Sequence, residues 1–208
     1  MLIVGLTGGI ASGKSTIARA LREEPGLAVV DADRIAWETY RPGTEVYKKL
    51  VERFGEGIVN DQGEIDRKKL GAIVFRDPEA RRFLNDIVHP AVLSKLREIA
   101  RRERARGTRV LVVEAALLLE SPHVDRRFFD YYVLVAVDPE EQLRRLMERD
   151  GLPREEALRR VQAQTPQDEK LPRADFVLWS RGRPKDTVRE AQALFRQLKE
   201  EAQRRNDP

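Results

Sequence analysis

Cysteine is absent from this sequence of 208 residues, and histidine occurs only as His89 and His123. Without cysteine the protein has no disulfide, no thiol nucleophile and no thiolate metal site. The two histidines lie far apart in sequence, so we do not expect a dedicated zinc site. No apolar run is long enough to span a bilayer, and the short run at residues 1–6 lacks the flanks of a signal peptide. We therefore expect a cytoplasmic protein with no membrane contact.

A large excess of one charge is also lacking. The chain carries 39 basic and 35 acidic residues, a net charge of +4, and 41% of its residues are hydrophobic. This balance is typical of a globular protein, and the length corresponds to one domain with additions. The slight positive excess is compatible with a nucleic-acid partner, but small anionic ligands explain it equally well.

What the sequence does contain is a phosphate-loop pattern directly after its first apolar run. Residues 8–15 read GGIASGKS and match G-x-x-x-x-G-K-[ST]. The glycines let successive N–H groups point at phosphate oxygens, Lys14 supplies a charge for the terminal phosphates, and Ser15 offers a hydroxyl to Mg²⁺. The helix expected from Lys14 adds its positive N-terminal dipole. The alternative is an ordinary glycine-rich turn. The residues expected to contact ATP are Gly9, Ala11, Ser12, Gly13, Lys14, Ser15 and Thr16.

Short apolar segments with the character of buried strands recur along the chain. They are residues 2–7, 27–31, 110–115, 131–138 and 176–179. Nearly continuous apolar runs are typical of parallel strands that are covered on both faces. Helical patterns separate them, so we predict an α/β fold in which helices flank a parallel five-stranded sheet.

Two stretches are too long to be simple crossovers. Residues 35–109 have mostly helical patterns and are predicted to form a helical substrate-binding insertion, in which Pro90 suits the first turn of a helix. Residues 138–164 are predicted to form two charged helices hinged at residues 151–153. If this hairpin is a lid, its arginines reach over the phosphate loop; the alternative is a solvated face with i,i+4 ion pairs. These arginines are Arg144, Arg145, Arg149, Arg159 and Arg160.

Acidic residues follow two of the predicted strands. Asp31 and Asp33 end the second strand, and in an extended chain both project to one side of the sheet edge. A carboxylate there can accept a hydrogen bond from an attacking hydroxyl and orient it for phosphoryl transfer. We favour Asp33, which lies farther beyond the strand, and assign Asp31 a supporting role. A turn or helix-cap aspartate is the alternative.

Glu114 ends the third strand after an apolar run that resembles a Walker B strand. We expect it to hold Mg²⁺ through water. Asp138 ends the fourth strand in the same way, but Pro139 follows it, so helix capping explains Asp138 better.

Other phosphate-loop classes have motifs that this sequence lacks. It has no N-K-x-D guanine motif and no L-S-G-G-Q motif, which argues against a GTPase and a transporter ATPase. The chain is also short for a RecA-like motor. A small-molecule kinase remains.

With these residues in place, the sequence resembles the dephospho-CoA kinase family over residues 2–195. The resemblance rests on the ordered segments GLTGGIASGKST, VVDADRIA, GEIDRKKLGAIVF, IVHPAV, EAALLLE, QLRRLMERDG and QTPQDEKLPRADFVLWSRG. It implies a fold like that of nucleoside-monophosphate kinases. The implied regions are a nucleotide-binding core of residues 1–34, 108–138 and 171–208, a helical CoA-binding region of residues 35–107 and a lid of residues 139–170.

The resemblance also implies an activity, the last step of coenzyme A biosynthesis. In this step the γ-phosphate of ATP moves to the ribose 3′-hydroxyl of 3′-dephospho-CoA, with Mg²⁺. The family pattern gives Asp33 the base role, and it makes Arg145 and Arg149 the lid arginines that neutralise the transferring charge. Arg67 and His89 match the acceptor region, although a local structural role is an equal alternative for His89. Leu118 belongs to the expected acceptor site.

Two segments depart from the family pattern. The family usually reads PLLFE where residues 116–120 read ALLLE, which keeps the apolar character but changes the wall near the acceptor. The family often has Asn before the late glycine, where this chain has Ser180 and Arg181. Residues that contact the adenine base are therefore left unassigned.

Two alternatives come from other classes. A nucleoside or nucleoside-monophosphate kinase shares the loop, but the insertion at residues 35–109 is generous for a bare nucleotide and suits a long pantetheine-bearing acceptor. A module that binds nucleic acid and merely holds ATP is suggested by the basic stretch 97–109, but Glu98 and Glu103 interrupt it and no aromatic residues interleave. We expect ATP and 3′-dephospho-CoA as partners, no nucleic acid, and a monomer or small homo-oligomer.

Overall fold

The computed structural model describes residues 1–116, 118–120 and 124–205. The chain forms two compact units: the first unit comprises Met1–Asp31 and Ala100–Pro208, and the second unit comprises Ala32–Ile99. No helix within the described residues is long and apolar enough to cross a membrane.

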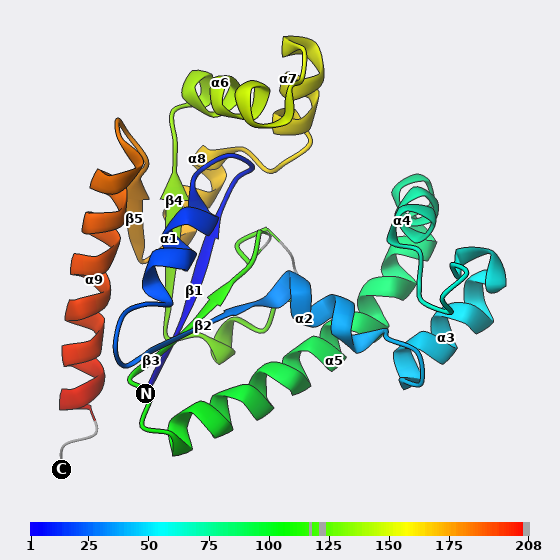
Figure 1. Cartoon of the computed structure of the whole chain (residues 1–208), viewed down its shortest axis with the longest axis horizontal. Helices are drawn as coiled ribbons and strands as arrows, with labels where there is room; N and C mark the ends of the chain where they lie inside the picture. The colour runs from blue at the N-terminus through cyan, green and yellow to red at the C-terminus, as the bar shows by residue number, and fades with distance from the viewer. Residues whose placement is uncertain (117, 121–123, 206–208) are drawn as a thin grey trace. The chain divides into compact units, whose positions relative to one another are not determined.

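A parallel sheet forms the centre of the first unit (Figure 1). Its strands are β1 (Leu2–Gly8), β2 (Leu27–Asp31), β3 (Val110–Glu114), β4 (Tyr131–Ala136) and β5 (Phe176–Trp179), in the spatial order β2-β3-β1-β4-β5. All the predicted strands are confirmed, and so is the α/β fold with a parallel five-stranded sheet. In the register, Glu114 stands opposite both Leu6 of β1 and Asp31 of β2. The ends of β2 and β3 therefore lie at the edge where β1 enters the phosphate loop.

Helices cover this sheet because its strands are apolar on both faces. In the first unit they are α1 (Lys14–Leu21), α6 (Pro139–Asp150), α7 (Arg154–Gln162), α8 (Gln167–Lys170) and α9 (Pro184–Arg204), with 3-10 turns at Arg126–Phe128 and Leu171–Arg173. Side chains of α1 and α9, including Ile17, Leu21 and Phe195, pack with Val4 and Leu6 of β1 in one buried cluster.

The hinge between α6 and α7 follows from local sequence. Asp138 caps α6 by accepting a hydrogen bond from the backbone N–H of Glu140, with Pro139 in the first turn, as predicted. Gly151 ends α6 with a φ of +66°, a left-handed conformation that favours glycine. The predicted pair of charged helices is therefore confirmed.

The second unit is helical, as predicted for this stretch. It contains α2 (Ala32–Thr39), α3 (Glu45–Phe54), a 3-10 turn (Glu56–Ile58), α4 (Arg67–Arg76) and most of α5 (Pro78–Ala105). Leu50, Ile58, Ile65 and Leu70 form its buried core.

The predicted helix start at Pro90 is wrong. Pro90 lies inside α5, which runs without a break from Pro78 to Ala105. The fixed φ of proline is already helical, so an internal proline costs one backbone hydrogen bond and a steric clash in the preceding turn. Because α5 continues through Pro90, the helix formed by the residues on both sides of it outweighs that cost.

Candidate active site

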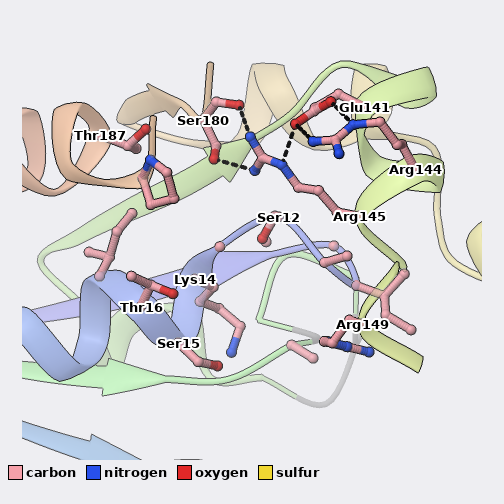
Figure 2. A pocket seen from close by; sticks show the side chains of 18 of the residues that line it. Ser12, Lys14, Ser15, Thr16, Glu141, Arg144, Arg145, Arg149, Ser180 and Thr187 are labelled. Atoms are coloured by element: carbon pink, nitrogen blue, oxygen red, sulfur yellow. Dashed lines mark hydrogen bonds and ion pairs between the residues drawn. The ribbon is translucent and has the colours of Figure 1, made fainter. Parts of the chain in front are cut away.

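A pocket of about 710 Å³ lies over the phosphate loop of the first unit (Figure 2). A volume of this size suits a small-molecule ligand. Its wall comes from the loop and α1, from α6, from the segment after α7, and from the β5–α9 connection. Its principal lining residues are Gly8–Ile17, Ala116, Glu141, Arg144, Arg145, Arg149, Gln164, Ser180, Gly182, Pro184 and Thr187.

The glycine before the helix has a conformational reason. Gly13 adopts a φ of +94° as the N-cap of α1, a region that L side chains rarely enter. Its carbonyl accepts hydrogen bonds from the N–H groups of Thr16 and Ile17, so the helix starts directly at the loop. The N-terminus of α1 therefore borders the pocket, where its dipole favours an anion.

Glu114 gathers the predicted charged groups beneath the loop. Its Oε1 accepts hydrogen bonds from Lys14 Nζ and Ser15 Oγ, both at 2.9 Å, and its Oε2 lies 3.6 Å from Arg22. The Glu114 side chain is only 7% exposed. The structure thus brings Lys14 and Ser15 together with Glu114, which lies about a hundred positions later in the sequence.

The same groups fit a magnesium ion. The Ser15 hydroxyl and the Glu114 carboxylate are oxygen donors in direct contact, and Mg²⁺ prefers oxygen ligands. Among the described residues no group of three or more His, Asp or Glu side chains is placed to hold a metal ion. The Ser15 hydroxyl and the Glu114 carboxylate suit Mg²⁺, because this ion usually keeps one or two protein ligands together with substrate phosphates and water.

Three arginines of α6 line the pocket, and Figure 2 shows Arg144 and Arg145 across from the loop and Arg149 at its side. Arg145 donates to Ser180 Oγ at 2.7 Å, to the Ser180 carbonyl at 3.1 Å and to Glu141 at 2.7 Å. Hydrogen bonds from Arg144 and Arg145 lower the pKa of Glu141 to about 2, so this carboxylate is ionised at neutral pH. Arg149 binds Asp150 at 2.7 Å, which lowers the pKa of Asp150.

Two more of the predicted lid arginines, Arg159 and Arg160, follow the ion-pair alternative, and Arg144 also forms ion pairs along its own helix. Arg159 and Arg160 lie 2.9 and 3.1 Å from Glu156, one turn away on α7. Both side chains are exposed, and such pairs on a helix surface contribute little to stability.

Ser12 contributes a second polar group to the loop. Its hydroxyl is buried and has no hydrogen-bond partner among the described residues. A buried donor without a partner is unfavourable, so a ligand oxygen at this position would satisfy it.

The geometric argument for Asp33 is wrong, although the residue stays a candidate. Asp31 is the last residue of β2, and α2 begins at Ala32, so the chain is not extended through Asp33. Asp33 instead lies in the first turn of α2. The alternation rule fails because the helix follows the strand without a linker.

The other predicted acceptor residues are distributed over both units. In the second unit, Arg67 starts α4, and its guanidinium lies 4.0 Å from the ring centre of the half-exposed Trp37. His89 lies within α5. In the first unit, Leu118 is buried. His123 lies outside the described residues.

Sequence reasoning missed two glutamines of the site. Gln142 on α6 and Gln164 after α7 both bind the backbone of Ile10 in the loop. Both fall in segments that carry the family resemblance, QLRRLMERDG and QTPQDEK. Nothing in the sequence indicates that their partner is a backbone amide and carbonyl.

Comparison with known proteins identifies the family. The family model for dephospho-CoA kinase matches residues 2–186. The chain belongs to the dephospho-CoA kinase family. It is 48% identical to the dephospho-CoA kinase of Geobacillus kaustophilus, over 94% of this chain and 96% of that protein. It is 47% identical to the dephospho-CoA kinase of Geobacter sulfurreducens, over 94% and 98%.

Solved structures agree with this assignment to the dephospho-CoA kinase family. The dephospho-CoA kinase from Campylobacter jejuni has a TM-score of 0.70 and 26% identity, covering 95% of this chain and 97% of that one. A shikimate kinase from Bacteroides thetaiotaomicron, at 16% identity, covering 94% of this chain and 98% of that one with a TM-score of 0.54, shares the fold alone. The phosphate-loop kinase fold and the predicted resemblance are thus confirmed, and with them an ATP-dependent kinase that acts on an alcohol group.

Proposed function

We propose that this protein transfers the γ-phosphate of ATP to the ribose 3′-hydroxyl of 3′-dephospho-CoA, giving CoA and ADP. The observation that carries the proposal is the pocket that Lys14 and Ser15 line together with arginines of α6, in a chain of this family. Glu114 binds Lys14 and Ser15 from beneath the loop. Phosphoryl transfer needs positioned charge more than covalent chemistry, and this pocket concentrates positive charge on two sides.

The phosphate loop binds the phosphates of ATP in this proposal. Backbone N–H groups of residues 13–15, at the N-terminus of α1, surround the phosphates, and Lys14 exchanges its contact with Glu114 for the terminal phosphate. Arg145 and Arg149 stabilise the negative charge of the transferring group. The β5–α9 connection, with Ser180 and Pro184, forms the side of the pocket that remains for the adenine ring of ATP.

Ser15 and Glu114 would hold a magnesium ion beside the loop, Ser15 as a direct ligand and Glu114 through water. When bound, Mg²⁺ neutralises charge on the phosphate oxygens. Glu114 keeps the Ser15 hydroxyl oriented, because its Oε1 accepts a hydrogen bond from Ser15 Oγ, with 2.9 Å between the two oxygens.

The acceptor side is assigned to residues 35–107, with Asp33 at its start as the base for the 3′-hydroxyl. Arg67 and His89 contact the acceptor in this proposal, and Leu118 supplies an apolar wall. Residues 139–170 form the lid, and residues 1–34, 108–138 and 171–208 form the core. An ionised Asp33 can accept the hydroxyl proton as the oxygen attacks phosphorus.

The test is ADP release with ATP and Mg²⁺ in the presence of dephospho-CoA, AMP, CMP, uridine or no acceptor. We expect ADP formation that depends on dephospho-CoA, with CoA formed in equal amount. The Lys14→Ala variant controls for contaminating kinases. Turnover with AMP, CMP or uridine but not with dephospho-CoA would contradict the acceptor assignment, although it would still agree with a kinase fold.

A further inference from the structure

Ile10, in the middle of the phosphate loop, has both of its backbone polar groups bound by glutamine side chains. Its N–H donates to Gln164 Oε1 at 2.8 Å, and its carbonyl accepts from Gln142 Nε2 at 2.8 Å. Gln142 lies in the first turns of α6, and Gln164 follows the end of α7 by two residues. The two ends of one helix pair therefore meet on a single residue of the loop.

Gly9 provides the space for this contact. A Cβ at Gly9 would lie 2.7 Å from Gln142 Nε2 and 3.2 Å from Gln164 Oε1. The phosphate-loop pattern does not require glycine at this position, because it is one of the variable positions between Gly8 and Gly13. The close approach of the two amides gives a specific reason for the second glycine of GGIASGKS.

Apolar packing links the same loop to the same helices. Ile10 and Ala11 pack against the buried cluster of Leu143, Leu146 and Ala157. Ala11 has a φ of +57°, which is the only positive value for a non-glycine residue in the described part of the chain. L-residues disfavour this conformation, so the surrounding contacts must hold it in place.

We propose that Gln142 and Gln164 act as a pair of positioning residues, here called the amide clamp, that fixes the phosphate loop to the base of the α6–α7 pair. The clamp keeps the loop in its nucleotide-binding form, so the affinity for ATP depends on two side chains of the helix pair. The inference deepens the proposed function and rests on it for the identity of the nucleotide.

The clamp has a direction that can be tested. A backbone N–H needs an acceptor, so Gln164 must present its oxygen, and a carbonyl needs a donor, so Gln142 must present its NH₂. Gln164→Glu keeps an acceptor in place, whereas Gln142→Glu loses the donor and sets a carboxylate against a carbonyl oxygen. Both substitutions add one negative charge next to Ile10, so their difference measures the lost hydrogen bond together with the repulsion between the new carboxylate and the Ile10 carbonyl.

The experiment is titration calorimetry of ATP binding, with kcat and KM for both substrates, on Gln142→Glu and Gln164→Glu. Gln162→Glu, at an exposed position at the end of α7, is the matched control. We expect Gln142→Glu to bind ATP about tenfold more weakly than Gln164→Glu, as for loss of one buried hydrogen bond. The KM for the acceptor should not change, and Gln162→Glu should match the wild type. Equal ATP affinities of Gln142→Glu and Gln164→Glu would overturn the proposal.

Two further measurements keep the result decisive. If Gln142→Glu does not fold, Gln142→Met and Gln164→Met remove each hydrogen bond without adding charge, and unchanged ATP affinity in both would overturn the clamp. Calorimetry of ATP binding needs no acceptor. A wild type that binds ATP but does not phosphorylate dephospho-CoA would refute the proposed function, while the comparison of the clamp variants would stand.

Discussion

At the residue scale, Asp33 was predicted to be the catalytic base from a strand geometry that the structure does not have. The sequence argument placed Asp31 and Asp33 on one side of an extended strand, but the chain turns into α2 at Ala32. The proposal for Asp33 now depends on the family pattern and on its place in the first turn of α2. Asp31 stays in the strand, opposite Glu114.

Replacement of Asp33 by alanine should separate chemistry from nucleotide binding. Without a base for the acceptor hydroxyl, we expect kcat to fall at least about 10²-fold, the usual scale for a general base. ATP affinity, measured by calorimetry, should stay within about twofold, because the phosphate pocket is lined by other residues. Asp31→Ala is the matched comparison, and a larger loss of kcat in Asp31→Ala would transfer the base role to Asp31.

Tyr132 gives a prediction on stability and pH. Its hydroxyl is buried with no hydrogen-bond partner among the described residues, and burial raises the pKa of Tyr132 to about 12. Because the folded pKa exceeds the unfolded value of 10, the unfolded protein loses the Tyr132 proton first. The free energy of unfolding is therefore unaffected by the ionisation of this group below pH 10 and falls as the pH rises from 10 toward 12. Tyr132→Phe removes a desolvated hydroxyl, so the free energy of unfolding should rise by about 1 kcal/mol at pH 7.

The measurement is urea unfolding of Tyr132→Phe and the wild type at pH 7 and pH 10.5. We expect the advantage of the variant to grow at the higher pH, where the unfolded wild type gains from ionisation. Tyr131→Phe is the control, because its hydroxyl donates to Glu201 at 2.7 Å and its removal should not stabilise. A less stable Tyr132→Phe at pH 7 would contradict the prediction.

At the scale of elements, apolar strands were predictable and the connections between them were not. The three central strands β1, β3 and β4 are short apolar runs that are buried almost throughout, so for them the sequence pattern and the final environment coincide. The outer strands β2 and β5 are mostly half-buried. Pro90 and Asp33 were misplaced because a helix can absorb a proline and can start directly after a strand. The sequence allowed one cluster to be predicted, that of Lys14, Ser15 and Glu114. The loop motif fixes the positions of the first two, and the edge of the sheet fixes the third. The amide clamp was not, because its partner is a backbone group.

A buried ion pair links two connecting segments of the first unit. Glu120 and Lys170 meet at 2.9 Å, and their side chains are 9% and 4% exposed. The other oxygen of Glu120 accepts from the N–H of Thr165, and Arg173 donates to the carbonyl of Leu119. The segment after β3 is thereby tied to the segment that leaves the helix pair.

Lys170→Met should destabilise the protein strongly, because it leaves the Glu120 carboxylate buried without its cation. We expect a loss of about 3 kcal/mol in the free energy of unfolding, measured in urea. The double variant Glu120→Leu with Lys170→Met should lose less than the sum of the two single variants, because neither charge is then left unpaired. Additive losses would show that the pair is not energetically coupled.

At the scale of the whole molecule, the chain divides into two units, and the proposed function assigns most of the acceptor site to the second unit. The residues that line the phosphate pocket all belong to the first unit. Arg67 and Trp37, stacked at 4.0 Å, belong to the second unit, which builds its own core around Leu50 and Leu70. If the second unit binds the acceptor, a change on its surface should leave the nucleotide site intact.

Arg67→Ala tests this separation. The guanidinium supplies positive charge and a planar face beside an exposed tryptophan, so its loss should raise the KM for dephospho-CoA by about tenfold or more. ATP affinity, measured by calorimetry without acceptor, should match that of the wild type. Lys68→Ala, at the next exposed position of α4, removes the same charge without the ring contact and should change neither value by more than about twofold. A parallel loss of ATP affinity in Arg67→Ala would mean that the two units do not bind their substrates independently.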